Sequence, residues 1–104
     1  MGTQGYTVVS HQAAQNELAQ LPNPDRDTLK NILIELSTLE QPTEHSKANP
    51  LRDTDNFFRV RSGDYRVICS LDLPHLKVLK VDQRDEHTYT KGLNEARERA
   101  TDSL

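Results

Sequence analysis

The sequence predicts an α+β fold in which an antiparallel sheet packs on a helical hairpin. Two segments with apolar residues at helical spacing precede three β-branched segments that are separated by short turns. The expected order is β-α-α-β-β-β, followed by either a C-terminal helix or a tail. With 104 residues there is room for one domain, so we expect a single unit over 1–104 with a core over about 6–90 and the helix or tail over 91–104.

The first strand is expected at 6–10, where the run YTVVS is rich in β-branched residues. Ser10 is a plausible N-cap for the helix that follows, in which Ala14, Leu18 and Leu21 recur at helical spacing. The sequence PNP then ends this pattern, and we expect a turn there.

A second helix is expected to begin at Asn23 as the capping residue, with Pro24 in the first helical position. Its apolar stripe consists of Leu29, Ile32, Leu33, Leu36 and Leu39. Two antiparallel helices joined by a proline turn are the simplest interpretation of these two segments.

Residues 41–56 are polar and lack periodicity, which predicts a loop. Strands are then expected at 57–62, 65–71 and 76–81. The connecting turns, SGD and DLPH, are so short that neighbouring strands must run antiparallel.

Charge is distributed unevenly along the chain. Residues 58–84 carry six Lys or Arg against three Asp or Glu, a local net charge of +3, although the whole chain has a net charge of −3. A basic patch on an acidic protein indicates a polyanionic ligand, because the local field governs contact with phosphates.

Strand alternation places Arg59 and Arg61 on one face and Phe58 and Val60 on the other. Since the helices must cover one face, we expect the arginines on the open, concave face. Other basic residues could join them there: Arg66, Lys77 or Lys80, and Arg84. An equally good interpretation is that these are ordinary solvent-facing residues paired with nearby acids: Asp53, Asp55 and Asp64.

Other classes of site have little support in the sequence. The single cysteine, Cys69, allows no internal disulfide and lies in a strand pattern, so we expect it in the core. The four histidines are scattered, and we expect no metal site and no small-molecule cofactor. Without a long apolar stretch or a secretory signal, we expect a cytoplasmic protein with no membrane contact.

Taken together, "FFRVRSGDYRVI" and "LKVLKVDQRDEHTY" resemble the RelE/ParE toxin superfamily, and within it the RelE-like branch. The resemblance spans roughly 6–90 and includes "AAQNELAQLP" and a closing V-x-x-R-x-x-x-x-Y pattern. It implies a microbial RNase-like fold without a metal. It also implies a type II toxin that cleaves mRNA in the ribosomal A site and is neutralised by a RelB-like antitoxin.

The resemblance also implies roles for individual residues. Arg59 and Arg61 look like the basic pair that approaches mRNA phosphates, and Lys80 completes the predicted substrate-binding set. Arg66 and Arg84 look like the arginines that bind the scissile phosphate. A terminal tyrosine that stacks on or orients the reacting nucleotide corresponds to Tyr89, which could equally be a core or interface aromatic.

The general base is not defined by this pattern. Some relatives have lysines where this chain has Arg59 and Arg61, and an arginine effectively cannot lose its proton. His87 titrates near neutrality and some relatives use a histidine beside the terminal tyrosine, so it is a candidate, with Glu86 a weaker one. His87 could also be an exposed residue at the start of the last helix.

Two alternatives to the nuclease stay open. One is a ParE-like protein that inhibits DNA gyrase without cutting nucleic acid, and the other is a RelE homologue with attenuated catalysis. The basic strand pair with Arg84 and Tyr89 favours the nuclease, while the missing lysines keep the attenuated homologue open.

Overall fold

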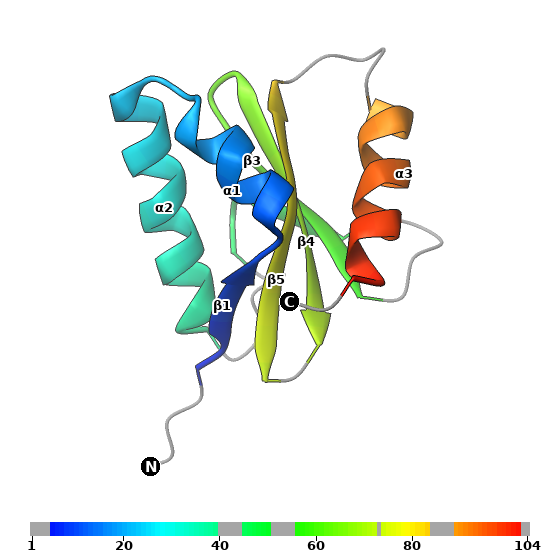
Figure 1. Cartoon of the computed structure of the whole chain (residues 1–104). Helices are drawn as coiled ribbons and strands as arrows, with labels where there is room; N and C mark the ends of the chain where they lie inside the picture. The colour runs from blue at the N-terminus through cyan, green and yellow to red at the C-terminus, as the bar shows by residue number, and fades with distance from the viewer. Residues whose placement is uncertain (1–4, 40–44, 51–55, 73, 84–88, 103–104) are drawn as a thin grey trace.

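The computed structural model describes residues 5–39, 45–50, 56–72, 74–83 and 89–102. The elements follow in this order: β1 (Thr7–Ser10), α1 (Gln12–Ala19), α2 (Asn23–Ser37), β2 (Ala48–Pro50), β3 (Phe57–Ser62), β4 (Tyr65–Asp72), β5 (His75–Gln83) and α3 (Tyr89–Ala100). The strands form one sheet in the order β1-β5-β4-β3-β2, with α1 and α2 on one face and α3 on the other (Figure 1). The predicted α+β class and helical hairpin are confirmed.

The sheet is mixed, whereas the sequence predicted antiparallel pairing throughout. β1 runs parallel to β5, with Val8 opposite Leu76, and every other pair of neighbours is antiparallel. The helical hairpin separates β1 from the later strands, so no tight turn fixes its direction. β2 lies within residues 41–56, which were predicted to form a loop, and it pairs with β3. The sequence did not predict this strand because three residues are too few to show the alternation of a strand. Pro50 is tolerated there because β2 is at the edge of the sheet.

Both helices of the hairpin begin differently from the prediction. The N-cap of α1 is His11 and not Ser10, because Nδ1 of His11 accepts a hydrogen bond from the Ala13 N–H at 3.1 Å. In α2 the cap position is Pro22, and Asn23 is the first helical residue. None of the helices in the described part of the chain is both long and apolar enough to cross a membrane.

The larger core lies between the hairpin and the sheet. α2 contributes four buried side chains to it: Leu29, Ile32, Leu33 and Leu36. Facing them, Phe58 and Val60 of β3 are fully buried, and Cys69 of β4 joins them as predicted. Burial raises the pKa of the Cys69 thiol, which leaves it a core residue and not a nucleophile.

A smaller core lies on the opposite face of the sheet, under α3. Ile68 of β4, Leu79 of β5 and Ala96 of α3 form it, and all three are fully buried. The C-terminal segment is therefore a docked helix and not a tail. Its short apolar stripe is sufficient because the sheet presents a matching pair of large apolar side chains.

A β-bulge separates the two halves of the β4–β5 pairing. Ile68 is opposite Lys80, but the next residue, Cys69, is opposite Val78, so Leu79 is an extra residue in β5. The alternation of side chains between the two faces of the sheet is interrupted at this bulge, so Leu79 and Lys80 both lie on the α3 side. Simple alternation along β5 could not have predicted this arrangement.

We expect Phe58→Ala to lower the free energy of unfolding by about 3–5 kcal/mol, because it removes a fully buried aromatic ring from the larger core. Chemical denaturation followed by circular dichroism measures the change. The matched control is Ile34→Ala on α2, whose side chain is 59% exposed and which should change stability by less than about 0.5 kcal/mol. Equal losses for the two variants would contradict the assignment of the core.

Candidate functional site

Three arginines lie on one face of the central strands. Arg61 of β3 is directly opposite Arg66 of β4, and Arg59 is opposite Ile68. Cross-strand partners share a face of the sheet, and Ile68 packs beneath α3. Arg59, Arg61 and Arg66 therefore share the face opposite the helical hairpin, which we call the arginine face.

The sequence predicted that the arginines lie on an open face, but in the structure a helix covers part of this face. α3 packs on the same side of the sheet, where Ala96 is fully buried and Leu93 and Ala100 are partly buried. The consequences differ between neighbours: Arg66 is only 5% exposed, whereas Arg61 is exposed at the end of β3.

Arg66 is held by a carboxylate that the sequence did not point to. Its Nε–H donates to Oδ1 of Asp82 at 3.2 Å, and the two residues are direct cross-strand partners in β4 and β5. Burial raises the pKa of Asp82 above its ordinary value of 3.8, although the nearby Arg66 guanidinium acts in the opposite direction. Asp82 thus positions Arg66 at a cost in its own solvation.

Lys80, predicted to bind substrate, lies between two carboxylates. Its ammonium donates to Oε2 of Glu17 at 2.9 Å and to Oε2 of Glu95 at 3.2 Å. Burial tends to lower the pKa of Lys80, but these two carboxylates raise it above the ordinary value. In this arrangement the charge of Lys80 is compensated within the protein by Glu17 and Glu95.

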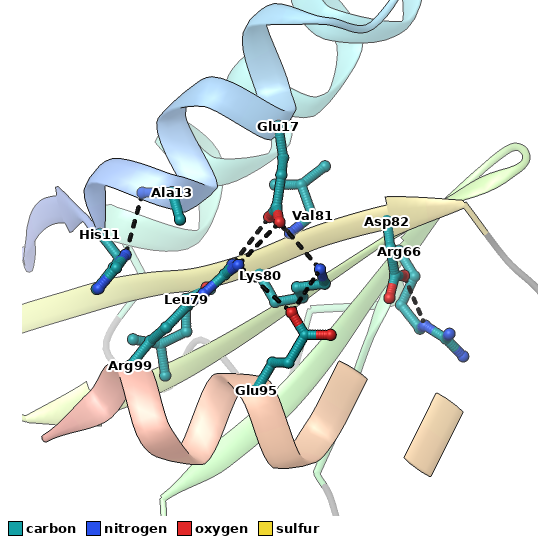
Figure 2. Close-up of polar contacts among 10 residues, drawn as sticks. All are labelled: His11, Ala13, Glu17, Arg66, Leu79, Lys80, Val81, Asp82, Glu95 and Arg99. Carbon is teal, nitrogen blue, oxygen red and sulfur yellow. Dashed lines mark hydrogen bonds and ion pairs between the residues drawn. The ribbon is translucent and has the colours of Figure 1, made fainter. Parts of the chain in front are cut away.

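The same carboxylate of Glu17 is bound by Arg99. Nη1 and Nη2 of Arg99 donate to Oε1 and Oε2 of Glu17, each at 3.0 Å, which is a bidentate pair. Figure 2 shows Glu17 reaching from α1 across β5 toward Arg99 and Glu95 of α3. We call these four residues, Glu17, Lys80, Glu95 and Arg99, the charge network.

The charge network also bonds to the backbone of β5. The Val81 N–H donates to Oε1 of Glu17 at 2.9 Å, and Nη1 of Arg99 donates to the Leu79 carbonyl at 2.9 Å. The pairing with β1 ends where Ser10 lies opposite Val78. Beyond that point, side chains from α1 and α3 bond to the backbone groups that a longer β1 would have paired.

These contacts determine the ionisation of Glu17. Burial alone would raise the pKa of Glu17, but the hydrogen bonds from Arg99, the Val81 N–H and Lys80 outweigh it. The pKa of Glu17 therefore lies below its ordinary value of 4.5, and the carboxylate is charged at neutral pH.

Several predicted site residues cannot be placed in this geometry. Arg84, His87 and Glu86 lie outside the described residues. Tyr89 is the first residue of α3. The arginine face is thus defined by Arg59, Arg61 and Arg66.

Surface hollows lined by described residues include one on each side of the sheet. One of about 580 Å³ lies between β1, α1 and α2, and its lining includes two exposed large apolar residues, Val8 and Ile34. It lies on the hairpin side, away from the arginines. The other, of about 280 Å³, is polar and includes Arg61.

In the described part of the chain, no group of three or more His, Cys, Asp or Glu is placed to hold a metal ion.

The sequence analysis did not identify the four residues that form ion pairs around the predicted basic residues: Asp82, Glu17, Glu95 and Arg99. Asp82 lies 16 residues from Arg66, and Glu17 lies 63 residues from Lys80 and 82 from Arg99. A local pattern cannot reveal such pairs. The spacing of Glu95 and Arg99 by four residues on a helix was the one available signal, and it indicates only a shared helix face.

The solved structures that resemble this chain include RelE toxins and toxin–antitoxin complexes. The RelBE2 toxin–antitoxin complex of Mycobacterium tuberculosis is 26% identical, with a TM-score of 0.65 over 80% of this chain and 95% of that chain. The archaeal RelE–RelB complex of Pyrococcus horikoshii is 28% identical, with a TM-score of 0.67 over 79% and 98%. An arginine double mutant of the Escherichia coli toxin RelE in the free state is 21% identical, with a TM-score of 0.70 over 86% and 96%. No family model and no curated protein sequence matches the chain.

The architecture is thus that of a small α+β toxin, matched over nearly the full length of each neighbour. The chain has the RelE-like toxin fold. This likeness supports a toxin of a type II toxin–antitoxin system.

We expect Glu17→Gln to destabilise the protein by about 1–3 kcal/mol at pH 7, because the amide cannot satisfy Arg99 and Lys80 as the carboxylate does. The folded-state pKa of Glu17 is lowered, so its contribution is complete above pH 4.5 and is lost as the pH falls through the folded-state value. Denaturant unfolding at a series of pH values should show the two proteins converging in acid.

The matched control is Glu98→Gln, an exposed position on the same helix as Arg99. It should leave stability unchanged across the pH range. A stability difference between wild type and Glu17→Gln that persists undiminished at low pH would show that charge is not the source of the effect.

Proposed function

We propose that this chain is the toxin of a type II toxin–antitoxin system and acts as a ribosome-dependent mRNA endonuclease. The observation that carries the proposal is the arginine face, with Arg59, Arg61 and Arg66 side by side on β3 and β4 of a RelE-like fold. Phosphate contacts are the general source of affinity for nucleic acid, and arginine is the side chain best suited to make them.

The reaction we propose is attack of an RNA 2′-hydroxyl on the adjacent phosphate. The substrate supplies its own nucleophile, so the protein must align it, remove its proton, stabilise the charged pentavalent state and protonate the leaving 5′-oxygen. Arg66 is suited to the third task, because a guanidinium offers parallel hydrogen bonds to phosphate oxygens. Asp82 contributes by holding Arg66 through Nε, which fixes the plane of the guanidinium.

Proton transfer needs a group other than the arginines. An arginine side chain can bind phosphate but is not suited to act as a base, which limits Arg59 and Arg61 to binding. His87 is our candidate for the base, with Glu86 as the weaker one, and Arg84 and Tyr89 are assigned to the scissile phosphate and the reacting nucleotide. These four assignments rest on the resemblance to RelE-like sequences.

We propose two macromolecular partners in the cytoplasm. The first is a RelB-like antitoxin, since the Mycobacterium tuberculosis and Pyrococcus horikoshii neighbours are toxin–antitoxin complexes. The second is the ribosome with mRNA in its A site. A short antitoxin gene should lie beside the gene for this chain, and its product should restore growth when the two are expressed together.

Arg66→Lys should reduce mRNA cleavage on programmed ribosomes by on the order of a hundredfold or more, because lysine keeps the charge beside Asp82 but loses the planar fork. Mapping of RNA 5′ ends measures cleavage, and wild type should cut free RNA poorly. Arg26→Lys is the matched control, since it makes the same chemical change on α2, on the hairpin side of the sheet. It should cut like wild type.

Other outcomes identify the alternatives. Growth arrest that persists in Arg66→Lys with supercoiling defects and without mRNA breaks would overturn the nuclease in favour of gyrase inhibition. Wild-type protein that is harmless on induction and leaves mRNA intact would indicate an attenuated homologue. Circular dichroism of each variant shows that a loss of cleavage is not a loss of fold.

A further inference from the structure

A polar hollow extends the arginine face toward the β2 edge of the sheet. Its volume is about 280 Å³, and its lining comes from the segment that leads into β2, from β2 and from the end of β3: Ser46, Lys47, Asn49, Arg61 and Gly63. Asn49 is directly opposite Arg59, and Arg61 is directly opposite Arg66. Cross-strand partners share a face, so the hollow and the arginine face form one continuous surface.

The charges along this surface are compensated unequally. Like charges directly opposite each other on adjacent strands destabilise a sheet, and Arg61 and Arg66 are such a pair. Asp82 forms an ion pair with Arg66 at 3.2 Å. Among the described residues, no carboxylate forms an ion pair with Arg61 or Lys47. The side chains of both are exposed, so the positive charge at the hollow is available to an anion from outside.

The other groups in the hollow suit a phosphodiester. The Ser46 hydroxyl and the Asn49 amide can donate hydrogen bonds to phosphate oxygens or accept them from a ribose hydroxyl. Gly63 has a φ of +57°, and a Cβ atom placed there would meet no other atom within 4 Å, so the hollow is not closed by packed atoms at the β3–β4 turn. An extended polyanion could therefore enter the hollow from the arginine face.

We propose that Lys47 and Arg61 form a subsite that binds a backbone phosphate of single-stranded RNA next to the phosphate bound at Arg66. This inference rests on the proposed function and adds Lys47, with Ser46 and Asn49, to its binding surface. Lys47 acts in binding and not in bond cleavage, because it lies on the far side of Arg61 from Arg66. Its loss should weaken the grip on RNA without changing the chemical step.

The test measures binding of the full-length protein to a labelled single-stranded RNA whose scissile 2′-hydroxyl is replaced by hydrogen, so that it cannot be cut. Lys47→Ala should weaken binding roughly five- to tenfold. It should also reduce the slope of log K against log salt by about 0.7, the value for one phosphate contact on a single strand. The matched control is Lys30→Ala, which removes an exposed lysine from α2 on the hairpin side of the sheet. It should change neither the binding affinity nor the salt slope.

A second arm locates the phosphate. Replacing single linkages near the scissile one by neutral methylphosphonates should weaken wild-type binding at one linkage, and at that linkage Lys47→Ala should cause no further loss. Losses that add independently at every linkage would overturn the subsite. On programmed ribosomes, Lys47→Ala should raise KM and leave kcat unchanged, whereas a fall in kcat at constant KM would contradict a binding role.

The outcomes separate this inference from the proposed function. If Arg66→Lys weakens RNA binding and Lys47→Ala does not, the subsite is wrong and the arginine face stands. If wild type does not bind the RNA and does not cut mRNA on ribosomes, the proposed function fails, and the subsite with it. The Lys47 side chain is exposed, and the carbonyl that accepts the Arg61 N–H at 3.1 Å belongs to the backbone, so the substitution leaves this bond in place and the fold should be retained.

Discussion

The unpaired edge of β5 is the constraint on which the rest of the arrangement depends. β1 stops opposite Val78, yet β5 continues to Gln83, so its next outward-facing backbone groups need partners from elsewhere. Leaving such groups buried and unsatisfied costs about as much as a lost hydrogen bond. Glu17 of α1 and Arg99 of α3 supply the bonds, and their bidentate pair then joins the two helices across the edge of the sheet. One pair of side chains thus closes the sheet edge and fixes both helices.

The β-bulge between β4 and β5 determines how α3 covers part of the arginine face. The bulge at Leu79 places an apolar and a basic side chain consecutively on the α3 side, where Leu79 anchors Ala96 and Lys80 binds Glu95. α3 is therefore docked by apolar contact and by charge, and Lys80 is occupied in that docking. The exposed positive charge of the described face lies at its other end, with Arg61 and Lys47 near the β3–β4 turn.

The sequence allowed the layers of this fold to be predicted but not its connections. Alternation was enough to separate Arg59 and Arg61 from Phe58 and Val60, and a short turn at Gly63 was enough to bring Arg66 back beside Arg61. The parallel pairing of β1, the bulge and the docking of α3 depend on tertiary contacts between distant segments, so no local pattern encodes them. For the same reason Asp82 was missed: its pairing with Arg66 depends on the register between β4 and β5.

The carboxylates of Glu17 and Asp82 both bind arginines, but their ionisation changes the stability of the fold in opposite directions. The pKa of Glu17 is lowered, so its ionisation stabilises the fold above pH 4.5 and that contribution disappears in acid. The pKa of Asp82 is raised, so keeping it ionised at neutral pH costs stability despite the bond to Arg66. The cost comes from the burial of the Asp82 carboxylate, and the Arg66 guanidinium offsets part of it. Glu17 and Arg99 therefore stabilise the scaffold through their charges, whereas the Arg66–Asp82 pair depends on the Arg66 guanidinium to keep a buried carboxylate ionised.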